Sequence, residues 1–446
     1  MTASSSLRMF ANDPVLRKIL GPGVMAFAIK IGAAALSYLM FIALARTMSL
    51  AEYGMFGVGF SWAILLAQVA AAGQPVLAMR LLPGLEGASH APERHAVLRY
   101  LHAALLLATA ATLALWMAAG AWADGLPLLY LLAVGAVCAT TAMSDMQTGI
   151  LRAEGEVAGA LVPREILWRL AVIGACVPAM AGWTTSWNAT FALDVLAILL
   201  VLAMIPQVAR RRGALAWIRP GPASADVGAW SRMSAWFALS AIISTIVPSM
   251  AVVILGWVAP PDETGPFFAA LKTSQMLMLI FIAGNIVAGP LFVRDFKRGD
   301  TGSVQRVAGA IALAAFLFSL AGAFLLLPLG SSVLRLFGQG FEEAWTSLQI
   351  LCFGTAIRAA LGPSAQVLQM CGAEEEAPRI AFVTSLLTLL LFPFAVLWTG
   401  PAGAATVMSI GQVVSAAWSN ERCRRRLGVD ASILGLFRGR PTGSCA

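Results

Sequence analysis

Long apolar segments alternate with short polar ones along the whole chain. Twelve segments are apolar enough to cross a membrane, and they cover residues 19–45, 54–79, 98–122, 126–147, 163–181, 188–209, 232–257, 266–292, 304–329, 345–371, 379–398 and 402–421. A helix needs about 20 apolar residues to cross about 30 Å of hydrocarbon. Because only helices and closed barrels satisfy their backbone there, and barrel strands are short and alternating, the pattern predicts about twelve transmembrane helices.

The composition agrees with a membrane protein. Hydrophobic residues make up 59% of the 446 residues and charged residues only 12%, whereas soluble domains hold about 25% charged residues. The first apolar segment is far longer than the core of a signal peptide, which is about 7–15 residues, so we expect it to be a retained first span. We therefore expect an all-α integral membrane protein.

Lysine and arginine residues gather in alternate loops. If the N-terminus lies inside the cell, only Arg46 and Arg335 among the 30 Lys and Arg residues fall in loops assigned to the outside. Cytoplasmic loops carry such an excess of basic residues. The bias predicts a multi-pass protein of the bacterial inner membrane with both termini in the cytoplasm. The net charge of +8 then reflects topology, and we expect the lipid bilayer, not nucleic acid, as a partner.

The two halves of the chain resemble each other weakly. Residues 52–56 (EYGMF) precede or open span 2, and residues 263–267 (ETGPF) stand 211 positions later, at span 8. Spans 5 and 11 repeat two prolines at an offset of 215, namely Pro163 and Pro178 against Pro378 and Pro393. The repeat predicts two six-helix lobes. Because six is even, the lobes share one orientation and are related by a pseudo-twofold axis along the membrane normal.

We divide the chain at its charged and proline-rich midpoint. The predicted parts are a cytoplasmic N-terminus (1–18), an N-lobe with spans 1–6 (19–209), a cytoplasmic linker (210–231), a C-lobe with spans 7–12 (232–421) and a basic cytoplasmic tail (422–446). The linker holds three successive arginines and then Pro220-Gly221-Pro222, a combination that favours a turn.

The junction of spans 1 and 2 resembles a known family. Residues 44–56, LARTMSLAEYGMF, are similar to the lar-x-ls-x-x-eyG-x-f segment of bacterial polysaccharide-biosynthesis flippases, and so are residues 336–338 (LFG) and the spacing of Leu368 and Gly372. These flippases belong to the multidrug/oligosaccharidyl-lipid/polysaccharide exporter superfamily. The resemblance implies a V-shaped, two-lobed carrier of twelve helices.

The same resemblance implies a function. Such carriers move an undecaprenyl-diphosphate-linked glycan, the repeat unit of an O-antigen or exopolysaccharide, from the inner to the outer leaflet by alternating access. A polysaccharide polymerase is then an expected partner. Peptidoglycan-precursor flippases have Tyr-Ala-Asp-Arg where this chain has residues 269–272 (AALK), and they usually have fourteen spans. Multidrug members often carry an aspartate in span 1, where this chain has no acidic residue.

Five charged residues within the spans are candidates for function. A charge at mid-membrane costs roughly 2.5–3.5 kcal/mol on insertion scales, so each one needs a reason. Lys30, Lys272 and Arg358 are candidates for binding the substrate diphosphate, because lysine and arginine suit phosphate. The alternative is that each pairs with an acid or a helix carbonyl, or extends to the interface. Asp145 and Asp194 are candidate sites for a coupling proton or cation, or partners for the cations.

Uncharged polar residues and helix breakers add further candidates. Side chains that could contact sugar hydroxyls, and that suit contacts between helices equally well, are Gln68, Gln275, Asn285, Gln366 and Gln369. Spans 2 and 8 are expected to break near their inner ends, where candidate hinge residues are Gly73, Pro75, Gly289 and Pro290.

Motifs for enzyme chemistry are absent from the sequence. We find no nucleotide-binding, phosphate-binding or zinc-protease motif, and no cysteine–histidine grouping with metal-site spacing, so we expect no cofactor and no metal. Two alternatives to the flippase stay open. One is a cation-coupled antiporter of small molecules or drugs with the same fold. The other is a membrane polysaccharide polymerase or ligase, which usually has a large outside loop rich in arginine.

Overall fold

The structure is a computed structural model that describes residues 14–85, 90–122, 126–210 and 226–437. The side chains of residues 14–27, 210, 286, 287 and 290 lie outside this description. Much of the predicted N-terminus, the predicted linker and the end of the predicted tail therefore lie outside the described residues.

The first half of the chain folds into helices throughout. Their bounds are α2 (Pro14–Thr47), α3 (Leu50–Ala71), α4 (Gln74–Leu81), α5 (Ala91–Trp122), α6 (Leu128–Ala153), α7 (Val157–Val162), the π-helical turn η2 (Pro163–Leu167), α8 (Trp168–Met180) and α9 (Ala189–Arg210). The second half contains α10 (Val227–Val258), α11 (Pro261–Gln275), the 3₁₀ turn η4 (Met276–Met278), α12 (Leu279–Lys297), α13 (Thr301–Arg335), η5 (Phe341–Ala344), α14 (Trp345–Ala360), α15 (Ser364–Met370), α16 (Glu376–Leu427) and η6 (Ile433–Leu436).

These helices form twelve spans within the described part of the chain. Nine helical segments are long and apolar enough to cross a membrane by themselves. Helix α16, one of these nine, contributes two spans rather than one, because Thr399 and Gly400 have non-helical backbone angles and separate its halves. The interrupted segments α7–η2–α8 and α14–α15 supply the remaining two. The all-α architecture expected from the sequence is confirmed, with no strand among the described residues.

The junction of spans 1 and 2 contains a capping motif at the start of span 2. Ser49 is the N-cap of α3, and its hydroxyl accepts a hydrogen bond from the backbone N–H of Glu52. A serine with glutamate three residues later is a capping-box sequence. Here the Glu52 carboxylate turns away and accepts from the backbone N–H of Ala189, at 2.7 Å. One short motif therefore fixes the start of α3 and ties it to the start of α9.

The predicted break in span 2 is present. Ala72 and Gly73 both have positive φ, which ends α3, and Pro75 lies in the first turn of α4, where a missing N–H is tolerated. The predicted break in span 8 at Gly289 is wrong, because α12 continues as a helix through that position, and span 8 is interrupted earlier, by the 3₁₀ turn η4. A single proline removes only one backbone donor, which transmembrane helices tolerate. The side chain of Pro290 lies outside the described residues.

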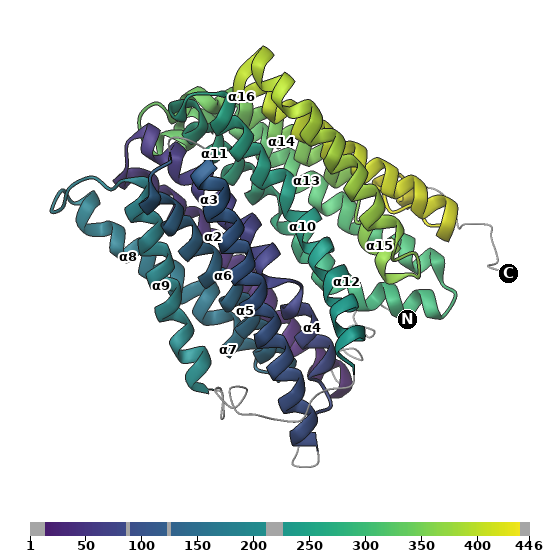
Figure 1. Ribbon diagram of the computed structural model, residues 1–446. Helices are drawn as coiled ribbons and strands as arrows, with labels where there is room; N and C mark the ends of the chain where they lie inside the picture. The colour runs from purple at the N-terminus through teal and green to yellow at the C-terminus, as the bar shows by residue number, and fades with distance from the viewer. Residues whose placement is uncertain (1–13, 86–89, 123–125, 211–225, 438–446) are drawn as a thin grey trace.

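The two halves form two lobes that meet at one end. We call the end where α2 passes into α3 and α10 into α11 the predicted outer end, because its sidedness follows from the sequence. Figure 1 shows the purple-to-teal helices of the N-lobe and the green-to-yellow helices of the C-lobe converging there and diverging toward the opposite end. Helix α3 packs against both α10 and α11, and the largest buried apolar cluster draws residues from both lobes.

Residues after α16 fold back against the C-lobe. The Oδ1 atom of Asp430 accepts hydrogen bonds from the side chains of Asn420, at 3.1 Å, and Ser432, at 2.6 Å. Gln305 of α13 donates to the backbone carbonyl of Gly435, at 2.8 Å. The basic tail predicted from residue 422 thus begins as the last turns of α16, and its described remainder is packed against α13.

Candidate functional site

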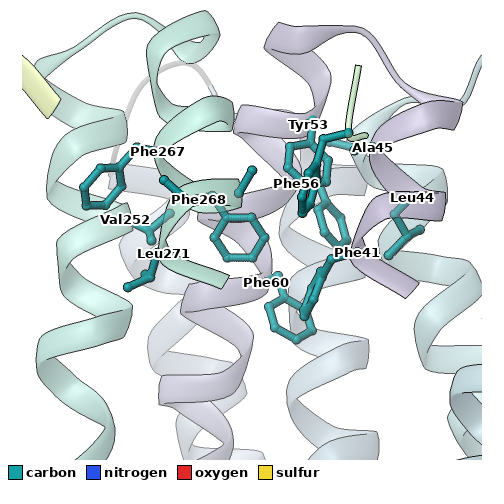
Figure 2. Close-up of a cluster of buried hydrophobic side chains, with 14 of the residues drawn as sticks. Phe41, Leu44, Ala45, Tyr53, Phe56, Phe60, Val252, Phe267, Phe268 and Leu271 are labelled. Atoms are coloured by element: carbon teal, nitrogen blue, oxygen red, sulfur yellow. The ribbon is translucent and has the colours of Figure 1, made fainter. Parts of the chain in front are cut away.

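Aromatic side chains from both lobes fill the predicted outer end. Phe56 and Phe60 of α3 each lie edge-on to Phe268 of α11, with ring centroids 6.3 Å apart. Phe41 of α2 lies 5.5 Å from both Phe60 and Phe268. Figure 2 shows these rings gathered between the helices of the two lobes. Because edge-to-face rings add to the energy of apolar burial, this aromatic cluster holds the lobes together at this end.

Two backbone contacts reinforce this closure. Gly54 of α3 and Gly265 of α11 lie against each other, so that a Cβ atom at Gly54 would stand 2.0 Å from the carbonyl oxygen of Pro261. Gly54 and Gly265 are the glycines that the repeat aligns at an offset of 211. Arg46 at the end of α2 donates to the carbonyls of Leu336, at 2.6 Å, and Arg335, at 2.9 Å. A cation is favourable at the carbonyl end of a helix, here α13.

Lys272 reaches the aromatic cluster from α11. Its Nζ atom lies 4.9 Å from the ring centroids of Phe41 and Phe268 and 5.5 Å from that of Phe60. A cation within about 6 Å of a ring centroid is attracted by the electron-rich face. Among the described residues no carboxylate pairs with Lys272. Span 8 begins at Pro261, so Lys272 lies about 16 Å along the helix from its start, near mid-membrane. This position is deeper than the one expected from a span that begins at residue 266.

A cavity of about 910 Å³ lies within the C-lobe. Its walls come from α10, α11, α12, α14, α15 and both halves of α16. Hydroxyl groups line it along several of these helices, from Ser244, Ser274, Thr355, Thr384, Thr388, Ser409 and Ser415. A smaller cavity of about 120 Å³ shares Pro248, Leu271 and Gln275 with it and is lined by Lys272. The two cavities therefore adjoin beside the aromatic cluster.

Arg358 of α14 lines the larger cavity. Its guanidinium carbon lies 4.9 Å from the ring centroid of Phe281, and Nη1 donates to the sulfur of Met278, at 3.4 Å. No carboxylate of the described chain forms an ion pair with it. Arg358 and Lys272 therefore share one property: each is a half-buried cation held by aromatic faces, without an anionic partner.

Four of the five predicted amide contacts line the larger cavity, namely Gln275, Asn285, Gln366 and Gln369. Gln366 donates to the backbone carbonyl of Asn285, at 2.7 Å, and so also joins α15 to α12. The Asn285 Oδ1 atom is buried, with no partner in the described part of the chain. Gln68 lies on α3, outside both cavities.

The third predicted cation, Lys30, lies apart from these cavities in the N-lobe. It forms an ion pair with Glu165 of η2. Glu165 also pairs with Arg169 of α8, at 2.9 Å, and Arg169 Nε donates to the hydroxyl of Ser37 on α2, at 2.5 Å. This N-lobe network compensates the charge of Lys30 and joins spans 1 and 5.

The two predicted acids occupy different environments. Asp145 of α6 pairs with Arg164 of η2, so it belongs with the compensated charges of the N-lobe. Asp194 of α9 is half-buried, and within the described ranges no hydrogen bond or ion pair reaches it. Neither acid lines the two cavities.

Solved structures match this arrangement of helices. An inward-facing multidrug resistance MATE family transporter of the MOP superfamily aligns with a TM-score of 0.67 at 15% identity, covering 91% of this chain and 98% of that one. The lipid II flippase MurJ, in an inward closed conformation, aligns with a TM-score of 0.69 at 12% identity, covering 90% and 87%. The chain has the fold of the MOP-superfamily transporters.

The similarity to known proteins lies in the fold and not in the sequence. No protein-family model and no curated protein sequence matches the chain. An outward-facing MATE structure also aligns, with a TM-score of 0.61 at 14% identity, covering 91% of this chain and 95% of that one. The MOP fold therefore occurs in inward-facing and outward-facing forms. The match to these structures confirms the predicted twelve-helix, two-lobed architecture. The matched proteins are transporters and a flippase rather than enzymes.

Sequence reasoning placed Glu165, Arg164 and Arg169 at the start of span 5 (163–181) but did not single them out as paired charges within the span. Span 5 was expected to begin at residue 163, but its helix begins at Val157. The arginines after Pro163 were therefore expected at the cytoplasmic end of the span. The signal that could have identified them is the alternation of arginine and glutamate, because opposite charges neutralise one another once the helices pack. The π-helical turn at η2 is a feature common at functional sites.

Proposed function

We propose that this protein is a flippase for undecaprenyl-diphosphate-linked oligosaccharide repeat units. It would carry them from the inner to the outer leaflet of the bacterial inner membrane for surface polysaccharide synthesis. The observation that carries the proposal is the pair of cations, Lys272 and Arg358, that border adjoining cavities and have no carboxylate partner in the described part of the chain. A diphosphate supplies the missing anion, because lysine and arginine both bind phosphate oxygens strongly.

The contrast between the lobes supports an anionic substrate. In the N-lobe, Lys30 and Arg169 share the carboxylate of Glu165. In the C-lobe, no described carboxylate compensates Lys272 or Arg358, and a buried charge without a partner is costly. An anionic headgroup therefore gains more from entering the C-lobe cavity than from approaching the N-lobe network. The amides and hydroxyls of the cavity wall suit sugar hydroxyls.

The proposed cycle follows alternating access. With the predicted outer end closed by the aromatic cluster, the headgroup enters from the cytoplasmic side and its polyprenyl tail stays in the bilayer. Opening to the outside requires that α3 and α11 separate at Gly54 and Gly265. Both termini lie in the cytoplasm in this proposal, and a polysaccharide polymerase consumes the product outside.

The proposal is tested in cells that lack the protein. Lipid extracts from these cells should hold complete undecaprenyl-linked repeat units facing the cytoplasm, and the wild-type chain should restore their export. Lys272→Ala and Arg358→Ala should lose most of this export at normal protein levels, whereas Lys272→Arg and Arg358→Lys, which keep the charge, should retain more. Arg379→Gln is the matched control, because Arg379 is an exposed cation whose ion pair among the described residues is with Glu375, outside both cavities. Normal export by both alanine variants would refute the proposal.

A cation-coupled antiporter is the second candidate. One observation favours it: Asp194 is a half-buried acid in the N-lobe whose charge no described residue compensates, and a multidrug transporter shares the fold. Under this alternative, Asp194→Asn should abolish drug uptake driven by a proton or sodium gradient in vesicles. A wild-type protein that shows no gradient-driven drug uptake would exclude it. The fold gives no support to the polymerase or ligase alternative, because the matched structures are transporters and a flippase.

A further inference from the structure

We infer that Lys272 determines the charge class of the substrate, because its own ammonium group fills an aromatic cage that would otherwise accept an organic cation. The inference deepens the proposed function and rests on it for the identity of the transported anion. The existence of the cage does not depend on that identity.

The geometry of the cage is that of an ammonium site. Phe41 comes from α2, Phe60 from α3 and Phe268 from α11, and all three ring centroids lie within 5.5 Å of Nζ. Figure 2 shows the three rings turned toward one region between the helices. The rings are 6%, 8% and 1% exposed. Aromatic cages of this kind recognise quaternary and methylated ammonium groups, and exclusion of water strengthens the attraction.

The groups on the open side of the ammonium are neutral. The small cavity beside Lys272 is lined by the polar side chains of Ser61, Thr245, Ser249 and Gln275, and by no acidic side chain. The positive charge therefore projects into the cavity without local compensation. A cation entering there is repelled, and an anion is attracted.

The caged lysine distinguishes between substrates of opposite charge, which the fold alone does not do. A multidrug transporter and a lipid II flippase share the architecture of this chain, so the arrangement of helices does not fix the charge of the substrate. A lysine tethered in the cage does fix it, because it occupies the cation site and supplies the positive charge. Removing the side chain beyond Cβ should leave three ring faces around a space shaped for an n-propylammonium ion.

The test measures binding of n-propylammonium to purified protein through its effect on thermal unfolding. A ligand that binds only the folded state raises the unfolding temperature with concentration. We expect Lys272→Ala to be stabilised progressively and the wild type to be unaffected, with an apparent affinity at least about tenfold higher for the variant. Arg358→Ala is the matched control, since it removes a cation that stacks on one ring only, and it should not respond.

Two further measurements separate a cation site from an empty space. The neutral isostere n-propanol should not stabilise Lys272→Ala, and the double variant Lys272→Ala/Phe268→Leu should lose the response to n-propylammonium. If Lys272→Ala does not fold, Lys272→Ser serves in its place. Equal responses of wild type and variant, or equal effects of n-propanol and n-propylammonium, would overturn the inference. Because no lipid-linked glycan is used, this result leaves the export test of the proposed function intact.

Discussion

Gly54→Ala is expected to weaken the closure of the predicted outer end. The added Cβ atom would lie 2.0 Å from the carbonyl oxygen of Pro261, and Cβ atoms do not approach heavy atoms closer than 3.0 Å. Helices α3 and α11 must therefore separate by about 1 Å at this point. The obstructing atoms belong to the backbone, so no side-chain rotation relieves the contact.

The size of the effect follows from the cost of overpacking, about 1–3 kcal/mol. The strain exists only while the two lobes touch, so it disfavours the closed conformation and leaves the open one unchanged. At 1.4 kcal/mol for each factor of ten, the population of the open conformation should rise between about 5-fold and 150-fold. The substitution acts on a conformational equilibrium and not on either cavity.

Accessibility of a cysteine at Thr264 measures this shift. Thr264 is fully buried beside Gly265, so a Thr264→Cys reporter should react with a maleimide only when the end opens. We expect faster labelling of purified protein when Gly54→Ala is added, with variants lacking the reporter as blanks. Gly174→Ala is the matched control, because a Cβ atom at Gly174 meets nothing within 4 Å. Equal labelling rates with Gly54→Ala and Gly174→Ala would refute this account of the closure.

Two other perturbations test parts of the fold outside the cavities. Glu165→Gln leaves Lys30 and Arg169 without their shared carboxylate, and we expect the free energy of unfolding to fall by about 3–5 kcal/mol in thermal or denaturant unfolding. The control Arg94→Gln, at a more exposed pair, should lower it by less than about 1 kcal/mol. Similar losses for the two variants would argue against a structural role of the N-lobe network. Asp430→Ala removes the hydrogen-bond acceptor that holds the segment after α16. This segment should become sensitive to limited proteolysis, and the free energy of unfolding should fall by about 1–3 kcal/mol. Unchanged protease resistance would contradict this role of Asp430.

The sequence predicted the features that depend on local pattern. The number of spans followed from hydropathy, and the break before Pro75 followed from its glycine and proline. The start of span 8 was placed late, because Asp262 and Glu263 look like loop residues although they form the first turn of α11. Acids are favourable in a first helical turn, next to the free N–H groups, so the same residues also suit a helix start.

Features that depend on distant residues were not predicted. Lys30 and Glu165 are 135 positions apart in the chain, and nothing in the sequence couples them. The aromatic cage was equally hidden, because Phe41, Phe60 and Lys272 come from three spans. The charges within spans were recognised correctly as unusual, but only the packing of the helices separated the compensated cations from the uncompensated ones.

The contact between Gly54 and Gly265 lies on the approximate symmetry axis that relates the two lobes. A position that meets its own repeat counterpart has the form of a contact in a symmetric homodimer, where each residue occurs twice about the axis. At the same offset of 211, the counterpart of Lys272 is Ser61, and both line the small cavity. Two identical half-length subunits would place two lysines there, with mutual repulsion. Joining both halves in one polypeptide removes that constraint and lets a single ammonium group stand opposite a hydroxyl.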